Sequence, residues 1–140
     1  MALIADSGAL YALYDIRDRY HLAVKNVVDR EFGPIILPMA ILAEIDYLLR
    51  IRLGARAVFR FLEGISIGVL TLEPFTPVDL KRCRSLLETY ADLKLGLADA
   101  AVIATAERLD THRILTVDER DFRAVRASDG TSFTLLPADA

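Results

Sequence analysis

The chain has 140 residues, of which 54% are hydrophobic, and a formal net charge of −3 at pH 7. This length suits a single domain spanning residues 1–140, and the negative charge argues against a protein that holds nucleic acid through bulk positive charge. The only cysteine, Cys83, excludes an internal disulfide and a cysteine-rich zinc site.

Neither membrane insertion nor export is indicated by the sequence. No stretch approaches the roughly 20 apolar residues of a membrane span, because charges or prolines interrupt every run. The start, MALIAD, lacks the basic region of a secretory signal. We therefore expect a cytoplasmic protein without a membrane partner. Its high hydrophobic fraction indicates apolar surface reserved for a protein partner.

Short apolar runs alternate with segments of helical periodicity along the chain. In chain order the pattern predicts a strand at 3–5, helices at 9–14 and 20–30, a strand at 35–37, helices at 38–52 and 55–63, a strand around 69–71, helices at 77–90 and 96–109, a strand at 113–117, a helical turn at 120–125 and a strand at 132–136. Gly54 separates two of the helices, and Thr76 with Pro77 marks the start of another as N-cap and first helical residue. This alternation predicts an α/β domain with a mostly parallel sheet, whose ligands bind beyond the carboxyl ends of the strands.

Four acidic residues fall where such a sheet would bring them together. Asp6 and Asp118 each follow a predicted strand, and Asp99 lies in the first turn of the 96–109 helix, on its apolar face. Glu44 lies at the border of the apolar arc of the 38–52 helix, half turned inward, whereas Asp46 is predicted to point away.

Each acid also has a purely structural explanation. Asp6 and Asp118 could cap the turns that follow them. Asp99 could cap its helix or interact with the helix dipole, and Glu44 could pair with an arginine such as Arg52.

Convergence of the acids would favour a metal site. At about 4 Å, two unit charges repel by about 4 kcal/mol at an effective dielectric of 20, so an ionised cluster must bind protons or cations. Carboxylates without cysteine or clustered histidine suit Mg²⁺ or Mn²⁺, and ions held by acids in a cleft indicate phosphodiester hydrolysis. The basic residues that recur at 50–60, 81–84 and 120–126 could then hold a nucleic-acid backbone, or they could be ordinary solvated helix faces.

Other catalytic patterns are absent. The sequence has neither the glycine pattern of a P-loop nor that of a dinucleotide-binding fold. His21 and His112 stand alone without metal-binding spacing, and no serine nucleophile elbow is present, so histidine catalysis is not expected.

The surroundings of the four acids resemble those in PIN-domain ribonucleases, specifically VapC-type toxins of toxin–antitoxin pairs. The resemblance covers the chain from Leu3 to about Leu136 and rests on the segments LIADSGALYAL, PMAILAEIDYLL, YADLKLGLADAAVIATAERL and RILTVDERDF. It implies a PIN-like three-layer α/β/α sandwich with a mostly parallel central sheet, and cleavage of RNA by an activated water.

The resemblance also implies roles for individual residues. It assigns the Mg²⁺ or Mn²⁺ site to Asp6, Glu44, Asp99 and Asp118. Ser7 and Thr116 would support this site, although both could equally make turn and strand-end hydrogen bonds. Asp121 is a substitute or partner for Asp118, and Asp92 is a less central extra acid.

Partners are implied in the same way. The family forms homodimers and binds a cognate antitoxin whose C-terminal segment covers the cleft. The interface residues stay open among Leu10, Tyr11, Tyr14, Leu48 and Phe61.

Two alternatives differ in chemistry. A haloacid-dehalogenase-like phosphatase would need a second aspartate two residues after Asp6, where this chain has Gly8. A catalytically silent PIN-like module that binds RNA or protein would have lost one of the four acids, and none is lost.

Overall fold

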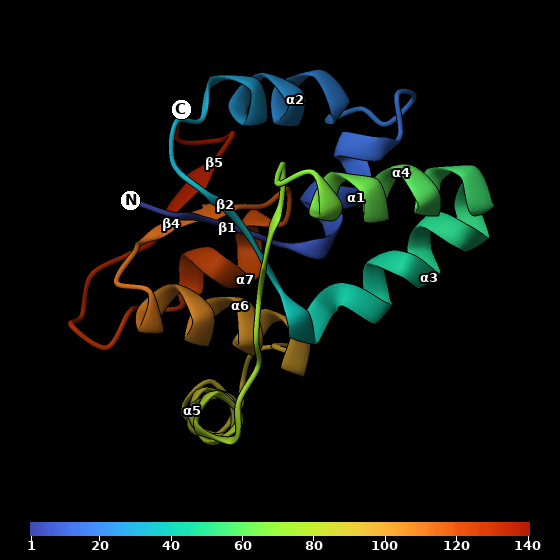
Figure 1. Ribbon diagram of the computed structural model, residues 1–140. Helices are drawn as coiled ribbons and strands as arrows, with labels where there is room; N and C mark the ends of the chain where they lie inside the picture. Colours follow the sequence, from blue (N-terminus) through green and yellow to red (C-terminus); the bar gives the residue numbers. More distant parts are fainter.

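The computed structural model describes all 140 residues, and in it the short apolar runs form five strands connected by helices (Figure 1). The elements in chain order are β1 (Leu3–Ala5), α1 (Ser7–Tyr14), α2 (His21–Arg30), β2 (Ile35–Pro38), a 3₁₀ turn (Met39–Ile41), α3 (Leu42–Arg52), α4 (Ala55–Ser66), β3 (Thr71–Glu73), α5 (Pro77–Thr89), α6 (Leu97–Arg108), β4 (Arg113–Leu115), α7 (Glu119–Ala124) and β5 (Thr134–Leu136). No helix combines the length and the apolar character that crossing a membrane requires.

All five strands run parallel, in the order β3-β2-β1-β4-β5. Every residue of β1 and β2 is buried, as expected for parallel strands covered on both faces. Figure 1 shows α1 and α2 on one side of the sheet, and α6 with α5 beyond it on the other. The predicted three-layer α/β/α sandwich is therefore confirmed.

Helix α6 forms the centre of one helical layer. It packs against β1, β2 and β4 on one side and against α5 on the other. Seven consecutive residues, 100–106, are buried, which is typical of a helix enclosed on all sides. Arg108 at its end bonds to Asp79 Oδ1 and Glu73 Oε2, both at 2.8 Å, so a buried ion-pair network joins α6 to the start of α5.

Several predicted boundaries differ from the structure. The predicted strand around 69–71 begins only at Thr71, since the amides of Val69 and Leu70 donate to the carbonyl of Gly64 near the end of α4. Helix α4 ends at Ser66 and not at 63, and the amide of Ile67 still donates to the carbonyl of Glu63. Pro38 ends β2 instead of opening a helix. The last two strands are shorter than predicted, at 113–115 and 134–136.

The residues considered for partner interfaces are mostly unavailable. Leu10 and Phe61 have no exposed surface and Tyr11 is buried, because α1 and α4 turn these side chains into the core. Burial excludes these three as interface residues, and of the five candidates Tyr14 and Leu48 keep some exposed surface. Other apolar side chains on α3 and α4 are exposed instead, namely Tyr47, Ile51 and Phe59.

Candidate active site

Asp6 lies where the strand order of the sheet reverses. The chain leaves β1 toward β2 on one side, while β4 and β5 lie on the other, and ligands of open parallel sheets bind at such a crevice. The amide of Asp6 donates to the carbonyl of Leu115 (2.9 Å), which fixes its backbone beside the end of β4.

Two donors hold the Asp6 carboxylate. The backbone N–H of Ser7 donates to Oδ1 at 2.8 Å, and the hydroxyl of Thr116 donates to Oδ2 at 2.9 Å. The side chain is only 5% exposed, and this burial raises the pKa of Asp6 to about 6, with Asp99 and Glu44 adding to the increase. Asp6 is thus a buried, oriented carboxylate with acids as its charged neighbours.

Thr116 has the supporting position predicted for it, whereas Ser7 acts through its backbone and not its hydroxyl. The Thr116 oxygen also accepts the amide hydrogen of Asp118 at 3.0 Å. One hydroxyl therefore connects the segment after β1 with the segment after β4.

Asp99 is half-buried in the first turn of α6. Its Oδ2 accepts the amide hydrogen of Gly96 at 3.2 Å, so it partly caps the helix. Gly96 has no side chain to return this bond, and no cation meets the carboxylate. Burial raises the pKa of Asp99, with further increases from Asp121, Asp118 and Glu44. In the sequence, the spacing of three residues between Gly96 and Asp99 is the pattern that could have predicted this partial cap.

Glu44 is exposed, so the prediction that it is half turned inward is wrong. It lies in the first turn of α3, between the buried residues Ile41 and Ile45, with its own side chain in solvent. Asp46, predicted to point away, is the half-buried residue, and it pairs with Arg50 at 3.0 Å. Arg52 lies over the ring of Tyr11 and does not pair with Glu44.

Two of the acids that follow β4, Asp118 and Asp121, have carboxylates that accept no hydrogen bond. Asp118 is the N-cap residue of α7 by position, but its carboxylate makes no hydrogen bond. Asp121 is half-buried in the first turn of α7. Asp92 is exposed in the loop between α5 and α6.

Five acids are therefore linked by charge repulsion and lack a cationic partner, and they are Asp6, Glu44, Asp99, Asp118 and Asp121. The ten ion pairs of the protein include none of them. Charge repulsion from the other acids adds to the increase in the pKa values of Asp6 and Asp99. As the side chains stand, no three acidic, histidine or cysteine groups are gathered closely enough to hold one ion together. The donor set is all oxygen, and the unbonded carboxylates of Glu44 and Asp118 can turn, so the residues fit a hard divalent cation.

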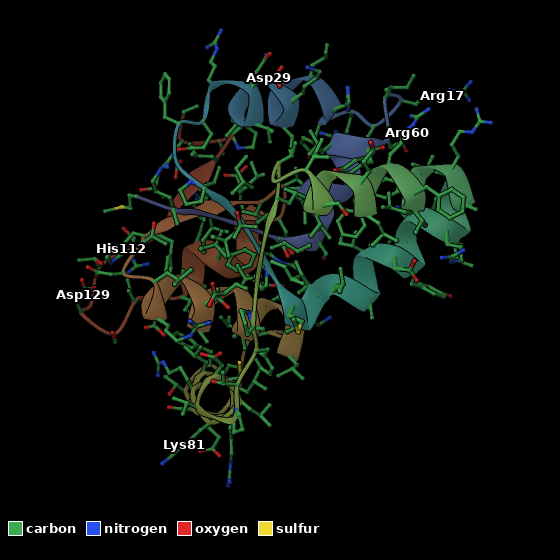
Figure 2. All side chains as sticks on the ribbon, viewed as in Figure 1. Arg17, Asp29, Arg60, Lys81, His112 and Asp129 are labelled. Carbon is green, nitrogen blue, oxygen red and sulfur yellow. The ribbon has the colours of Figure 1, made fainter.

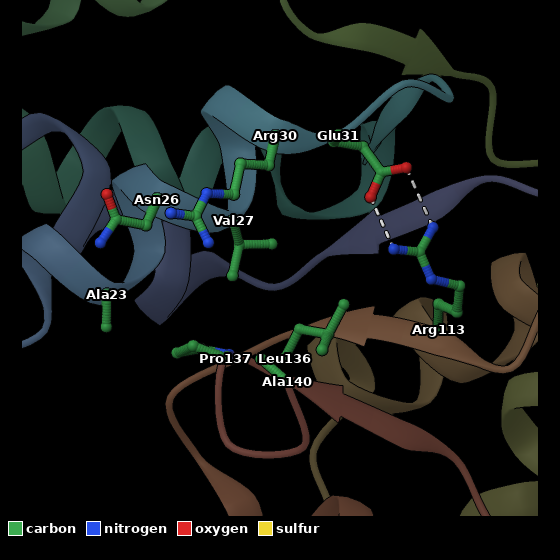
Figure 3. A pocket seen from close by; sticks show the side chains of 9 residues that line it. All are labelled: Ala23, Asn26, Val27, Arg30, Glu31, Arg113, Leu136, Pro137 and Ala140. Atoms are coloured by element: carbon green, nitrogen blue, oxygen red, sulfur yellow. Dashed lines mark hydrogen bonds and ion pairs between the residues drawn. The ribbon is translucent and has the colours of Figure 1, made fainter.

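Another pocket, of about 380 Å³, lies between α2 and the C-terminal segment (Figure 3). Its Arg113 and Glu31 form a two-bond ion pair at 3.0 and 2.6 Å. None of the five acids lines this pocket. The candidate active site is therefore the carboxylate group at the end of β1 and β4.

Comparisons with known proteins agree with this geometry. A family model described as PIN domain matches residues 3–128. Ribonuclease VapC26 of Mycobacterium tuberculosis is 32% identical over 135 residues, which cover 96% of this chain and 100% of that protein. The structure of VapC20 of the same organism, described as a sarcin–ricin loop cleaving toxin, has a TM-score of 0.73 at 19% identity and covers 80% of this chain and 86% of its own. A toxin–antitoxin complex from Klebsiella pneumoniae has a TM-score of 0.69 at 18% identity, with coverage of 88% and 92%.

Proposed function

Because the chain belongs to the PIN-domain family, we propose that it is a divalent-metal-dependent endoribonuclease and the toxin of a toxin–antitoxin pair. The observation that carries this proposal is the group of five carboxylates without a cationic partner at the crevice between β1 and β4. A purely structural group of acids would be paired with arginine, as the buried side chains of Asp79 and Glu31 of this protein are.

Asp6, Glu44, Asp99 and Asp118 would hold Mg²⁺ or Mn²⁺ in this site. When bound, such an ion polarises a water molecule and neutralises charge on the phosphate. Thr116 and the Ser7 amide orient Asp6, and each leaves its carboxylate oxygen a further lone pair for a ligand. Asp121 raises the pKa of Asp99 more than Asp118 does, which supports Asp121 as a partner in the site.

The partners follow from the same assignment. We expect RNA as substrate, a homodimer, and an antitoxin that covers the site, as a toxin–antitoxin complex exists for the Klebsiella relative. The exposed apolar side chains of α3 and α4 offer surface for such contacts. The family membership does not support the phosphatase alternative.

The test is cleavage of single-stranded RNA by the purified protein with Mn²⁺ or Mg²⁺. EDTA should abolish cleavage, and Asp99→Asn should lower the rate by about 100-fold or more, as loss of one charge-stabilising group does in other active sites. Glu63→Gln is the matched control, because Glu63 is exposed and unpaired on α4, and it should cleave like the wild type. Unchanged cleavage by Asp99→Asn would contradict the site. RNA binding without cleavage would identify a silent module.

A further inference from the structure

A second pocket, of about 270 Å³, opens between the loop after α1 and the first half of α4. We call it the arginine pocket, because Arg17, Arg56 and Arg60 line it together with Asp15. All three arginines are exposed. Figure 2 shows Arg17 and Arg60 on the same side of the molecule, near α4 and the loop after α1.

The arginines of this pocket differ from most others in the chain. Six arginines form ion pairs with acids, two lie over aromatic rings, and Arg126 donates to backbone carbonyls. Five guanidinium groups make none of these contacts, and they are Arg17, Arg30, Arg56, Arg60 and Arg120. Three of these five free groups meet in one pocket.

Asp15 offsets only part of their charge: its pKa is lowered mainly by hydrogen bonds from Tyr11 and Arg17 and also by the charge of Arg17, but no guanidinium bonds to it. Its Oδ2 accepts the hydroxyl hydrogen of Tyr11 at 2.6 Å, and its Oδ1 accepts the backbone N–H of Arg17 at 3.0 Å. No guanidinium of the pocket pairs with it. Arg56 and Arg60 are also four residues apart on α4, a spacing at which like charges destabilise a helix. Their placement costs stability, so it favours a role in binding an anion.

The arginine pocket and the five acids are joined by two helices. Helix α1 runs from Asp6 at the acids to Asp15 at the pocket, and α3 runs from Glu44 to Leu53, which also lines the pocket. Eight residues of α1 span about 12 Å at 1.5 Å per residue. The pocket therefore lies within reach of the same extended nucleic-acid strand that occupies the acids.

We propose that the arginine pocket binds a backbone phosphate of the RNA strand whose cleaved phosphodiester lies at the acids. Guanidinium groups bind phosphate through paired charged hydrogen bonds, and such contacts fix the register of a strand without reading its bases. The pocket would thereby give a protein of net charge −3 the local positive charge that RNA binding needs. This inference rests on the proposed function.

The test compares two variants with equal loss of charge. The pocket variant carries Arg17→Gln, Arg56→Gln and Arg60→Gln. The control carries Arg19→Gln, Lys25→Gln and Arg30→Gln, at exposed positions outside the arginine pocket and outside the basic segments 50–60, 81–84 and 120–126. The pocket variant should raise KM for a single-stranded RNA about tenfold while kcat at saturation changes less than about twofold, because its contacts position the strand and do not touch the reacting atoms. The control should leave both within about twofold.

Binding without cleavage gives a second, independent readout. With EDTA present, fluorescence anisotropy of a labelled RNA across a salt series should give a slope of log Kobs against log[salt] whose magnitude is smaller by about 0.7 in the pocket variant, since the pocket binds one phosphate and each single-strand phosphate contact contributes about 0.7. If the wild type binds RNA but never cleaves it, the proposed function fails and this slope still tests the pocket. If the wild type cleaves and both variants match it in KM and slope, the pocket proposal alone fails.

Two further results decide the remaining cases. A pocket variant with unchanged RNA parameters but lost affinity for the antitoxin would assign the pocket to a protein partner and overturn the proposal. The three side chains make no hydrogen bonds and two of them repel each other, so circular dichroism should match the wild type and the melting temperature should be equal or slightly higher. If the triple variant fails to fold, the single variant Arg60→Glu replaces it in the test, and its KM for RNA should also rise.

Discussion

Replacing Asp6 with asparagine should stabilise the protein at neutral pH when no divalent metal is present. Burial raises the pKa of Asp6 from 3.8 to about 6, so between these values the folded protein keeps a proton that the unfolded chain has lost. Stability therefore falls as the pH rises through this window, and the full penalty is present above about pH 6. At about 1.4 kcal/mol per pH unit the penalty is about 3 kcal/mol.

Asparagine can keep the hydrogen bonds that hold the native side chain. Its Oδ1 can accept the Ser7 amide hydrogen, as the carboxylate does at 2.8 Å. Its amide nitrogen can donate to Thr116 Oγ1, whose own hydrogen can turn to the carbonyl of Asp118 at 3.4 Å. We therefore expect Asp6→Asn to raise the free energy of unfolding by about 1–3 kcal/mol at pH 7 and to change it much less at pH 4, where the folded carboxyl is protonated and the unfolded one is near its midpoint, so most of the penalty is absent.

The assay is urea unfolding in EDTA at several pH values between 4 and 7. Asp29→Asn is the control, because Asp29 is exposed on α2 and pairs only with Lys25, so its effect should stay within about 0.5 kcal/mol. A stability difference between Asp6→Asn and wild type that does not grow from pH 4 to pH 7 would refute the reasoning. A large loss of stability at pH 7 would show that Asp6 is a structural residue.

Three further predictions concern the same site and the core. Mn²⁺ at 100 times its Kd should stabilise the wild type by about 2.7 kcal/mol and Asp6→Asn by much less, measured by thermal unfolding; equal gains would place the ion elsewhere. Thr116→Val removes the hydroxyl that lowers the pKa of Asp6. Cleavage at pH 7 should therefore fall about 10–100-fold, and the acid limb of the pH–rate profile should move to higher pH. Thr116→Ser keeps a hydroxyl and should retain activity. Burial raises the pKa of the Cys83 thiol to about 11, so it should not react with a disulfide reagent at pH 8 until the protein unfolds; rapid reaction of the native protein would contradict the packing of α5.

Local patterns in the sequence were sufficient for the order of elements and for most of their bounds. The apolar run before Asp6 and the Thr76–Pro77 helix start appear in the structure as β1 and as the capped start of α5. The family resemblance is likewise confirmed. These features depend on neighbours a few residues away, which the sequence displays directly.

The strand after α4 and the exposure of Glu44 could not be read in this way. Val69 and Leu70 have strand-forming side chains, but their backbone amides close a turn onto the carbonyl of Gly64, which a pattern of side chains does not display. Glu44 borders an apolar arc, but its own side chain is exposed.

Charge pairing between distant segments was decided by the tertiary structure, unlike the four ion pairs between residues four apart on one helix. The sequence shows Arg56 and Arg82 as members of similar basic clusters, yet Arg82 pairs with Glu107, 25 residues away, while Arg56 remains free. The five acids of the site are likewise separated by up to 115 residues, from Asp6 to Asp121. Periodicity determines which side of a helix or strand is buried. Which charges meet depends on how distant segments pack, because Coulomb interactions follow separation in space and not in sequence.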